Sequence, residues 1–343
     1  MKQVFLLASL LSAATVAFPA IAGAADAAYF AGKTMKFVIP YGPGGTYDTY
    51  GQTFAAHFGK HVPGKPTVIV QHMPGAGGVK AMNWAYTVMP KDGLNMIVPL
   101  DNSVVNQLMQ PDRMRYDARN FHWIGASNQT NLVMAIRSDT GVKTWQDLKG
   151  KALIASSSGQ DTSFIGCNLV NGLLGAKIKV VSGYKGSNAA MFAIEQGESQ
   201  MANYNWLAWG SKVSHWFKGD KPFARAVLQI GFWRDPDIAQ DVPMLSDLVT
   251  APEDKAVVAF IASLGALGRG LALPPGTSAD LVKTLRASYD AMNADPDFAA
   301  ALKKRKLRLI PSKGEDVQKI VLNAINNATP AVVKRASKIV YGK

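Results

Sequence analysis

Residues 36–48, Lys-Phe-Val-Ile-Pro-Tyr-Gly-Pro-Gly-Gly-Thr-Tyr-Asp, are the stretch that decides the fold of this chain. Residues 37–39 form a short apolar run that predicts a buried strand, and the glycine and proline cluster after it ends that strand abruptly. Beyond the glycines, Tyr50, Phe54 and Phe58 recur every four residues and would share one face of a helix. The expected order is therefore strand, glycine loop, helix.

A junction of this kind can bind an anion. The first backbone N–H groups of the helix lack intrahelical partners, and the helix dipole adds partial positive charge at the same place. Gly44 and Gly45 have no Cβ, so their backbone can adopt positive φ and let a ligand approach the amides closely. The loop has neither the Gly-Lys-Ser/Thr of a P-loop nor the GxGxxG spacing of a dinucleotide fingerprint. Taken alone, the stretch fits an anion-binding loop or an ordinary tight turn.

The start of the chain has the pattern of a secretory signal peptide. A positive charge at Lys2 precedes an uncharged apolar stretch over residues 4–18, and small residues at 22–24 offer a cleavage site. An uncleaved anchor is disfavoured because the apolar run is short for a bilayer. We therefore expect residues 1–24 to be removed and the mature protein to lie in the periplasm; release into the medium is the alternative.

Composition limits the function classes. The chain has 343 residues, enough for two domains of ordinary size, and one cysteine, Cys167, so no intramolecular disulfide is expected. The formal net charge of +13 favours attraction of anionic small molecules or acidic surfaces and does not by itself indicate a nucleic-acid partner. The densest basic cluster, residues 303–308, follows an expected helix, where cations suit the C-terminal dipole; a docking patch for an acidic partner is the alternative.

Two more apolar strands are expected in the first half, over residues 67–70 and 94–100, with the glycine turn 74–78 and a helix between them. Near-continuous apolar strands joined by helices predict a parallel sheet that is covered on both faces. In such sheets ligands bind beyond the carboxyl ends of the strands. The loop 42–48 and Asn102-Ser103 would then face the same crevice.

The pattern of strand, small polar loop and helix returns in the second half. Residues 152–155 precede the loop 156–162, and residues 178–181 precede the loop 182–187; each loop is followed by a helical pattern. These loops could form a second polar cradle or simply cap their helices. The short strand expected over residues 199–205 ends in amides and aromatics.

Two lobes without a flexible linker suggest a hinge, which the chain would cross near residue 130 and again near residue 265. Residues 264–273 predict a strand that returns to the first lobe. Arg269 is unusual in such an apolar run. We interpret it as a surface residue; the alternative is that its guanidinium binds a ligand carboxylate, in which case a ligand with a second carboxylate is expected.

Seven short motifs follow one another in an order typical of one family. They are PYGPGGTYD at 40–48, MPGAGG at 73–78, PKDG at 90–93, YD at 116–117 with FHWIG at 121–125, SSG at 157–159, YKGS at 184–187 and PPGT at 274–277. Together they resemble the solute-binding proteins of tripartite tricarboxylate transporters, also called the Bug family. The resemblance covers nearly the whole mature chain.

The resemblance implies the α/β fold of type II periplasmic binding proteins, with two hinged lobes and a ligand cleft between them. Lobe I would comprise residues 25–130 and 265–343, and lobe II residues 131–264. The protein would capture a small organic anion, above all a carboxylate, and deliver it to the membrane permease subunits of the transporter. It would act as a monomer, without a cofactor or metal.

The ligand-binding residues are expected on loops of both lobes. By position in the family motifs, and with Asn102 and Ser103 added from the strand-end argument, they are Tyr41, Gly44, Gly45, Thr46, Asp48, Asn102, Ser103, Ser157, Ser158, Gly159, Thr162, Tyr184, Gly186 and Asn203. Two departures from the family pattern prevent the transfer of a ligand from any relative. Residues 268–270 stand where an aromatic residue is common, and Asn203 or Asn205 replaces a frequent aspartate.

Catalysis is not expected, and no catalytic residue is assigned. His57 and His61 lie four residues apart but have no clear third metal ligand, and residues 156–158 do not fit the GxSxG nucleophile elbow. A secreted hydrolase is thus a weak alternative. A ligand-sensing partner of a signalling receptor would use the same fold and cleft, and the sequence does not separate it from transport.

Overall fold

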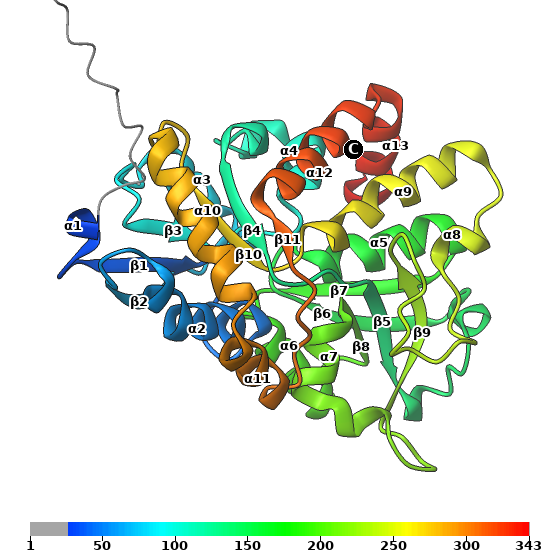
Figure 1. The fold of residues 1–343 in the computed structure, drawn as a ribbon. Coiled ribbons are helices and arrows are strands. Elements are labelled where there is room, and N and C mark those ends of the chain that lie inside the picture. Colours follow the sequence, from blue (N-terminus) through cyan, green and yellow to red (C-terminus); the bar gives the residue numbers. More distant parts are fainter. Residues whose placement is uncertain (1–26, 343) are drawn as a thin grey trace, which may run out of the picture.

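The computed structural model describes residues 27–342, so the expected signal peptide at residues 1–24 lies outside the described residues. Two β-sheets lie side by side, each with helices packed around it (Figure 1). We call the parts built on the first and second sheets the first and the second lobe. None of the helices between residues 27 and 342 is both long enough and apolar enough to cross a membrane.

The first sheet has the strand order β11-β4-β10-β3-β1-β2. β1 pairs in parallel with both β2 and β3, and β10 is antiparallel to β3 and β4. The expected parallel arrangement of the first three strands is therefore confirmed. The strands of this sheet are β1 (Thr34–Ile39), β2 (Thr67–His72), β3 (Asn95–Ile97), β4 (His122–Ala126), β10 (Gly270–Leu273) and β11 (Ser312–Lys313).

The second sheet repeats this arrangement in the order β7-β6-β8-β5-β9. β6 lies between its parallel neighbours β7 and β8, as β1 lies between β2 and β3, and β5 is the antiparallel strand next in order. Two sheets of the same design confirm the expected two-lobed α/β fold. The strands are β5 (Leu132–Arg137), β6 (Ala152–Ser157), β7 (Lys177–Ser182), β8 (Met201–Asn205) and β9 (Ala224–Ile230).

Helices connect the strands and cover both sheets (Figure 1). They are α1 (Ala27–Phe30), α2 (Thr46–Phe58), α3 (Val79–Thr87), α4 (Ser103–Met109), α5 (Thr162–Leu174), α6 (Ser187–Glu195), α7 (Trp206–Val213), α8 (Leu245–Leu248), α9 (Pro252–Leu267), α10 (Ala279–Asn293), α11 (Pro296–Lys304), α12 (Gly314–Asn327) and α13 (Pro330–Tyr341).

Helix α2 carries the aromatic face that the sequence predicts. Tyr50, Phe54 and Phe58 are all fully buried. Phe54 contacts Tyr289 of α10 and Phe298 of α11, with ring centroids 5.7 and 6.0 Å apart. Burying such large apolar side chains contributes a few kcal/mol each, so this cluster fixes α2, and with it the glycine loop, on the first sheet.

The segment that returns to the first lobe, residues 264–273, is not one continuous strand as expected. Residues 264–267 complete α9, and the strand β10 begins only at Gly270. Since the last ten residues of α9 are nearly all buried, an apolar run of this length has no polar face to mark it as a helix. Gly268 ends the helix with φ of +60°, a conformation that favours glycine.

The two expected crossing points of the hinge lie side by side. The N–H of Thr130 donates a hydrogen bond to the carbonyl of Gly265 at 3.3 Å. A Cβ on Gly265 would lie 2.2 Å from the carbonyl oxygen of Thr130, so only glycine allows this approach. The last helix, α13, packs on α5 of the second lobe. The lobe boundaries expected from the sequence stay a prediction.

Candidate functional site

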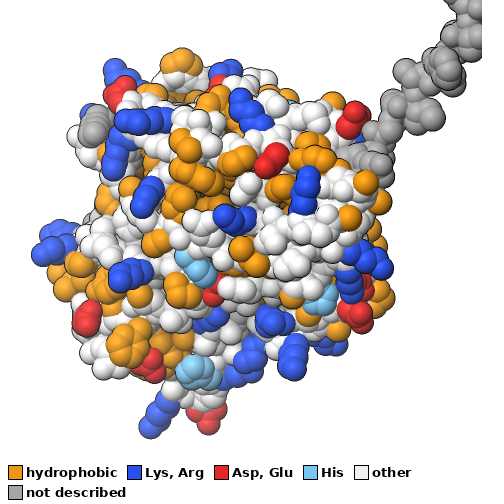
Figure 2. All heavy atoms as spheres, turned by 90° about the vertical axis from the view of Figure 1, so that its left-hand side faces the viewer, with side chains coloured by type: hydrophobic (Ala, Val, Ile, Leu, Met, Phe, Trp, Pro, Cys, Tyr) orange, Lys and Arg blue, Asp and Glu red, His pale blue; other side chains and the backbone are white. Residues whose placement is uncertain are grey.

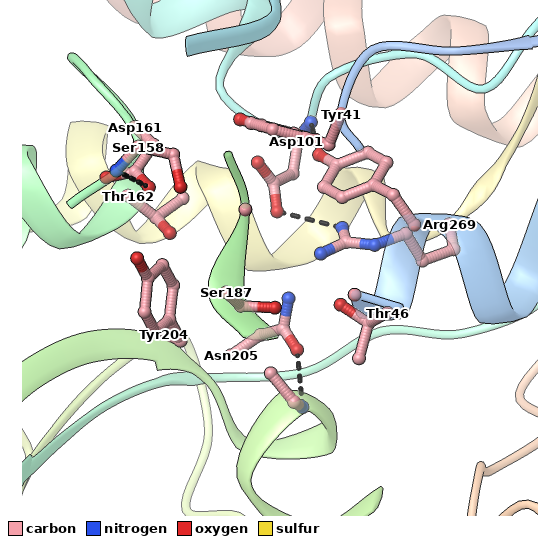
Figure 3. Close-up of a pocket in the computed structure, with 14 residues that line it drawn as sticks. Tyr41, Thr46, Asp101, Ser158, Asp161, Thr162, Ser187, Tyr204, Asn205 and Arg269 are labelled. Atoms are coloured by element: carbon pink, nitrogen blue, oxygen red, sulfur yellow. Dashed lines mark hydrogen bonds and ion pairs between the residues drawn. The ribbon is translucent and has the colours of Figure 1, made fainter. Parts of the chain in front are cut away.

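A cavity of about 30 Å³ lies between the lobes, at the carboxyl ends of their parallel strands. Most of its lining residues follow β1, β3, β6 or β7 in the chain, and Tyr204 and Asn205 end β8; the others are Ala208 on α7 and Arg269, which precedes β10 (Figure 3). This is where ligands bind in open α/β sheets. The lining residues are Tyr41, Gly45, Thr46, Tyr47, Asp101, Ser158, Asp161, Thr162, Gly186, Ser187, Tyr204, Asn205, Ala208 and Arg269.

The lobes touch each other around this cavity. The N–H of Gly42 in the first lobe donates to the carbonyl of Lys185 in the second at 3.1 Å. The Lys212 ammonium of α7 donates to the hydroxyl of Thr49 on α2 at 3.0 Å. The structure is therefore a closed arrangement, in which the two loops face each other directly.

Helix N-termini from both lobes converge on the cavity. α2 follows Gly45 and α6 follows Gly186, and neither glycine offers a side chain to cap the helix. Gly186 has φ of +149°, outside the range that other residues adopt readily. The N-terminus of α5 differs, because the Asp161 side chain caps it. Two uncapped N-termini of helices with 13 and 9 residues thus present partial positive charge to one small space.

The Asp48 side chain stabilises the glycine loop. Its carboxylate accepts a hydrogen bond from the Gly44 N–H at 2.8 Å and lies 2.8 Å from Nε2 of His72. Burial acts to raise the pKa of Asp48, but these hydrogen bonds outweigh it and hold the pKa below its ordinary value. Gly44 has φ of +91°, so the positive φ expected of the loop is present there. Asp48 does not line the cavity.

Asp161 organises the polar loop of the second lobe. It accepts hydrogen bonds from the N–H of Ser158 at 2.9 Å, the N–H of Ser163 at 3.0 Å and the hydroxyl of Ser157 at 2.8 Å. Burial raises the pKa of this carboxyl in spite of these bonds. The loop is thereby fixed with the Ser158 side chain at the cavity.

Arg269 is buried at the cavity, so our interpretation of it as a surface residue is wrong. Only 3% of it is exposed. Its Nη1 lies 2.8 Å from Oδ2 of Asp101, and its guanidinium stacks 3.7 Å from the ring centroid of Tyr47. The turn at Gly268 directs it inward, where an ion pair and an aromatic face replace the water that a surface arginine would keep.

Among residues 27–342, three fully buried polar side-chain atoms at the cavity have no hydrogen-bond partner within 3.5 Å. They are Oγ of Ser158, the hydroxyl of Tyr204 and Nε of Arg269. Figure 3 shows Ser158 and Tyr204 on one side of the space and Arg269 on the opposite side. Burial raises the pKa of Tyr204 well above its ordinary value, so this hydroxyl is a neutral donor. Buried polar groups without partners cost free energy, and a polar ligand in the cavity would satisfy them.

The structure brings six of the expected site residues together at the cavity. They are Tyr41, Gly45, Thr46, Ser158, Thr162 and Gly186. Gly159 and Tyr184 lie beside it, in a surface depression that also contains Tyr41 and Ser158. Gly44 faces Asn188 of the opposite lobe instead: a Cβ on Gly44 would lie 3.3 Å from Nδ2 of Asn188.

The other expected residues do not line the cavity and instead hold the surrounding elements in place. Asn203 is fully buried and its Nδ2 donates to the carbonyl of Thr162 at 3.2 Å, so it fixes α5 on β8. Asn102 donates to the carbonyl of Gln160 at 3.3 Å, which links the lobes next to the cavity. Ser103 is fully buried in the first turn of α4, and Ser157 is a hydrogen-bond partner of Asp161.

Sequence reasoning did not assign the remaining lining residues. They are Tyr47, Asp101, Asp161, Ser187, Tyr204, Asn205, Ala208 and Arg269. Some signals were present: Asp161 precedes a helical pattern, as a capping residue does, and Asn205 caps α7 by accepting from the N–H of Ala208 at 2.9 Å. Trp206 does not line the cavity; its ring packs on Phe217, with centroids 5.1 Å apart.

Positive charge is spread over the surface that Figure 2 shows. Lys and Arg side chains are scattered over this face among polar and apolar ones, and they do not gather in one stripe. With the formal net charge of +13, this arrangement gives a mild general attraction for anions.

No family model matches the chain. A UPF0065 protein of Bordetella pertussis (strain Tohama I) is 22% identical over 346 residues, which cover 93% of this chain and 94% of that protein. The likeness thus extends over almost the full length of both proteins.

Solved structures of periplasmic binding proteins align with the chain. The periplasmic binding protein BugD has a TM-score of 0.69 and 17% identity, over 90% of this chain and 98% of its own. MatC from Rhodopseudomonas palustris, with bound malate, has a TM-score of 0.68 and 18% identity, over 90% of this chain and 99% of its own. The chain therefore has the fold of the periplasmic binding proteins, and these likenesses support its resemblance to the solute-binding proteins of tripartite tricarboxylate transporters.

Proposed function

We propose that this chain is a periplasmic solute-binding protein that captures a small carboxylate between its lobes and delivers it to a tripartite tricarboxylate transporter-type permease. One observation carries the proposal: the uncapped N-termini of α2 and α6, one from each lobe, converge on the same small cavity. An anion at this place would receive free backbone donors from both lobes at once.

Binding at this place would also couple the ligand to closure. Because each lobe supplies one helix end, the ligand gains its full set of donors only when the lobes are together. Hydrogen bonds between the lobes, such as Gly42 to Lys185 and Lys212 to Thr49, then stabilise the closed state further. A ligand shifts such an equilibrium by the difference of its affinities for the two states. The closed form would be the form that docks on the permease.

Two further points support the proposal. The malate-bound MatC structure has the same fold, which supports a carboxylate as the ligand class. The lining residues offer hydrogen-bond donors and one neutralised arginine, an arrangement that suits binding without chemistry. Export by a signal peptide, a periplasmic location and a monomeric state belong to the same proposal.

A thermal-shift screen of the mature protein against carboxylates, with sugars and neutral amino acids as controls, tests the proposal, and calorimetry would confirm each hit. A ligand at a hundred times its Kd adds about 2.7 kcal/mol to the folded state, which corresponds to a shift of several degrees. We expect at least one carboxylate to give such a shift. Shifts with sugars or neutral amino acids alone would contradict the proposal.

Two glycines of the loop before α6 provide a matched pair of variants. Gly186 and Gly183 have φ of +149° and +125°, so alanine strains the backbone at both positions. Gly186 lines the cavity and Gly183 does not. We expect Gly186→Ala to weaken binding of the acid at least tenfold, because it moves the N-terminus of α6, and Gly183→Ala to keep most of the affinity. Equal losses in both variants would count against the role of this helix end.

A further inference from the structure

The guanidinium of Arg269 offers an unused edge to the cavity. Its Nη1 is occupied by Asp101 and by the carbonyl of Gly268, whereas within residues 27–342 neither Nε nor Nη2 makes a hydrogen bond. Figure 3 shows the guanidinium between Asp101 on one side and Thr46 and Ser187, the first residues of α2 and α6, on the other. A carboxylate at the two helix ends can therefore be bound side-on by this free edge.

The charges around the cavity suit one negative charge on the ligand. Asp101 neutralises Arg269 at 2.8 Å, and Asp161 offsets the positive end of α5, which it caps. The uncapped ends of α2 and α6 remain and favour an anion; at α2 this effect is reduced by Asp48 in the first turn, which lies against His72. Arg269 is the only cationic residue among the described residues that line the cavity, and Asp101 pairs with it, so a second carboxylate would find no free cation there.

The opposite end of the cavity suits a neutral oxygen. The hydroxyls of Ser158 and Tyr204 make no hydrogen bond within 3.5 Å there to any described residue, although the Tyr204 hydroxyl interacts electrostatically with Ser158 and Asp161, and both residues are at least nine-tenths buried. The neighbouring carboxylate of Asp161 is already engaged by backbone N–H groups and by a serine hydroxyl. A second ligand carboxylate at this end would lie near Asp161 without a cation to balance it, whereas a hydroxyl or carbonyl oxygen would simply accept the two hydrogen bonds.

The cavity is also small. Its volume is about 30 Å³. A ligand in this closed arrangement must therefore be short.

We infer that the cavity selects a short monocarboxylate that carries a hydroxyl or carbonyl oxygen, and that Arg269 is a residue that determines this specificity. The Nε–Nη2 edge of Arg269 and the ends of α2 and α6 bind the carboxylate, and Ser158 and Tyr204 bind the neutral oxygen. The inference rests on the proposed function as a carboxylate-binding protein. It replaces the expectation that a ligand bound by Arg269 carries a second carboxylate, because Asp101 already neutralises this arginine.

Calorimetry with 2-hydroxybutyrate and malate tests the inference, because the two acids differ by the exchange of a methyl group for a carboxylate. We expect 2-hydroxybutyrate to bind at least tenfold more tightly than malate, and more tightly than butyrate, which lacks the hydroxyl. Tighter binding of malate or of longer dicarboxylates would overturn the inference and leave the proposed function intact. Failure of every carboxylate to bind would instead overturn the proposed function.

Variants of the ion pair separate specificity from folding. Loss of Arg269 alone would leave the Asp101 carboxylate buried and unpaired, so the double variant Arg269→Gln/Asp101→Asn removes both charges together. With folding checked by thermal unfolding, we expect it to bind 2-hydroxybutyrate at least tenfold more weakly. Arg269→Lys keeps the charge but loses the fork, and it should also bind more weakly. Wild-type affinity in the double variant would overturn the role of Arg269.

A tyrosine pair tests the other end of the ligand. Tyr204→Phe removes an unpartnered hydroxyl in the cavity, whereas Tyr184→Phe removes a hydroxyl outside it that is bonded to Glu198. We expect the preference for 2-hydroxybutyrate over butyrate to fall toward one in Tyr204→Phe and to persist in Tyr184→Phe. An unchanged preference in Tyr204→Phe would contradict the assignment of this hydroxyl.

Discussion

Asp161 allows a quantitative test, because one carboxylate holds the polar loop of the second lobe. It accepts hydrogen bonds from the N–H groups of Ser158, Ser163 and Phe164 at 2.9, 3.0 and 3.2 Å. Asp161→Ala leaves these three donors without their acceptor. A buried donor that loses its partner costs about 1–3 kcal/mol, and a helix N-cap contributes about 1 kcal/mol. Taking the low end for each donor, we expect a loss of about 3 kcal/mol in the free energy of unfolding.

Urea unfolding followed by circular dichroism measures this loss. Asp161→Asn keeps an oxygen for the end of α5 but places an NH₂ group against one of the donors, so we expect a smaller loss of about 1 kcal/mol. Asp220→Ala is the control, because Asp220 is exposed, and its change should stay within about 0.5 kcal/mol.

The loss in the free energy of unfolding is expected to be largest in Asp161→Ala, smaller in Asp161→Asn and smallest in Asp220→Ala. A loss below about 1 kcal/mol in Asp161→Ala, or a loss as large in Asp220→Ala, would refute the view that this carboxylate organises the loop. Asp161→Ala should also weaken ligand binding, because Ser158 would lose its fixed position at the cavity.

Three further predictions concern the hinge, the first-lobe loop and closure. Gly265→Ala should lower the free energy of unfolding by about 1–3 kcal/mol in urea titrations, because the new Cβ meets the Thr130 carbonyl; an unchanged midpoint would exclude that close contact. Asp48 has a lowered pKa in the folded state, so its stabilisation is present above its ordinary value of 3.8 and is lost as the pH falls below it; thermal unfolding against pH should show a shallower acid limb in Asp48→Asn, and an identical limb would contradict this. Lys212→Met removes the hydrogen bond to Thr49 and should weaken ligand binding about fivefold in calorimetry, whereas tighter binding would show that this contact does not stabilise closure.

The sequence predicts well what is decided by residues close together in the chain. The glycine loop before α2 has its positive φ at Gly44, and the aromatic face of α2 is buried as expected. Both follow from local causes, the absence of a Cβ and the helical period. The sequence indicated crossing points near residues 130 and 265, but not the direct contact between Thr130 and Gly265.

The chemistry at the centre of the cavity depends on distant residues and was not predicted. The partner of Arg269, Asp101, lies 168 residues away in the chain, so nothing near Arg269 indicates that its charge is neutralised inside the protein. Asn203 was expected at the cavity, but its neighbour Tyr204 lies there instead, since adjacent strand residues face opposite sides. Packing of Asn203 on Gly166 of α5 decides which of them reaches the cavity.

A crystal structure of the protein with a carboxylate identified by calorimetry would test the central claim most directly. The account predicts closed lobes and a carboxylate within hydrogen-bond distance of the first N–H groups of both α2 and α6. A carboxylate bound at one lobe only, or at a place away from Thr46 and Ser187, would contradict it.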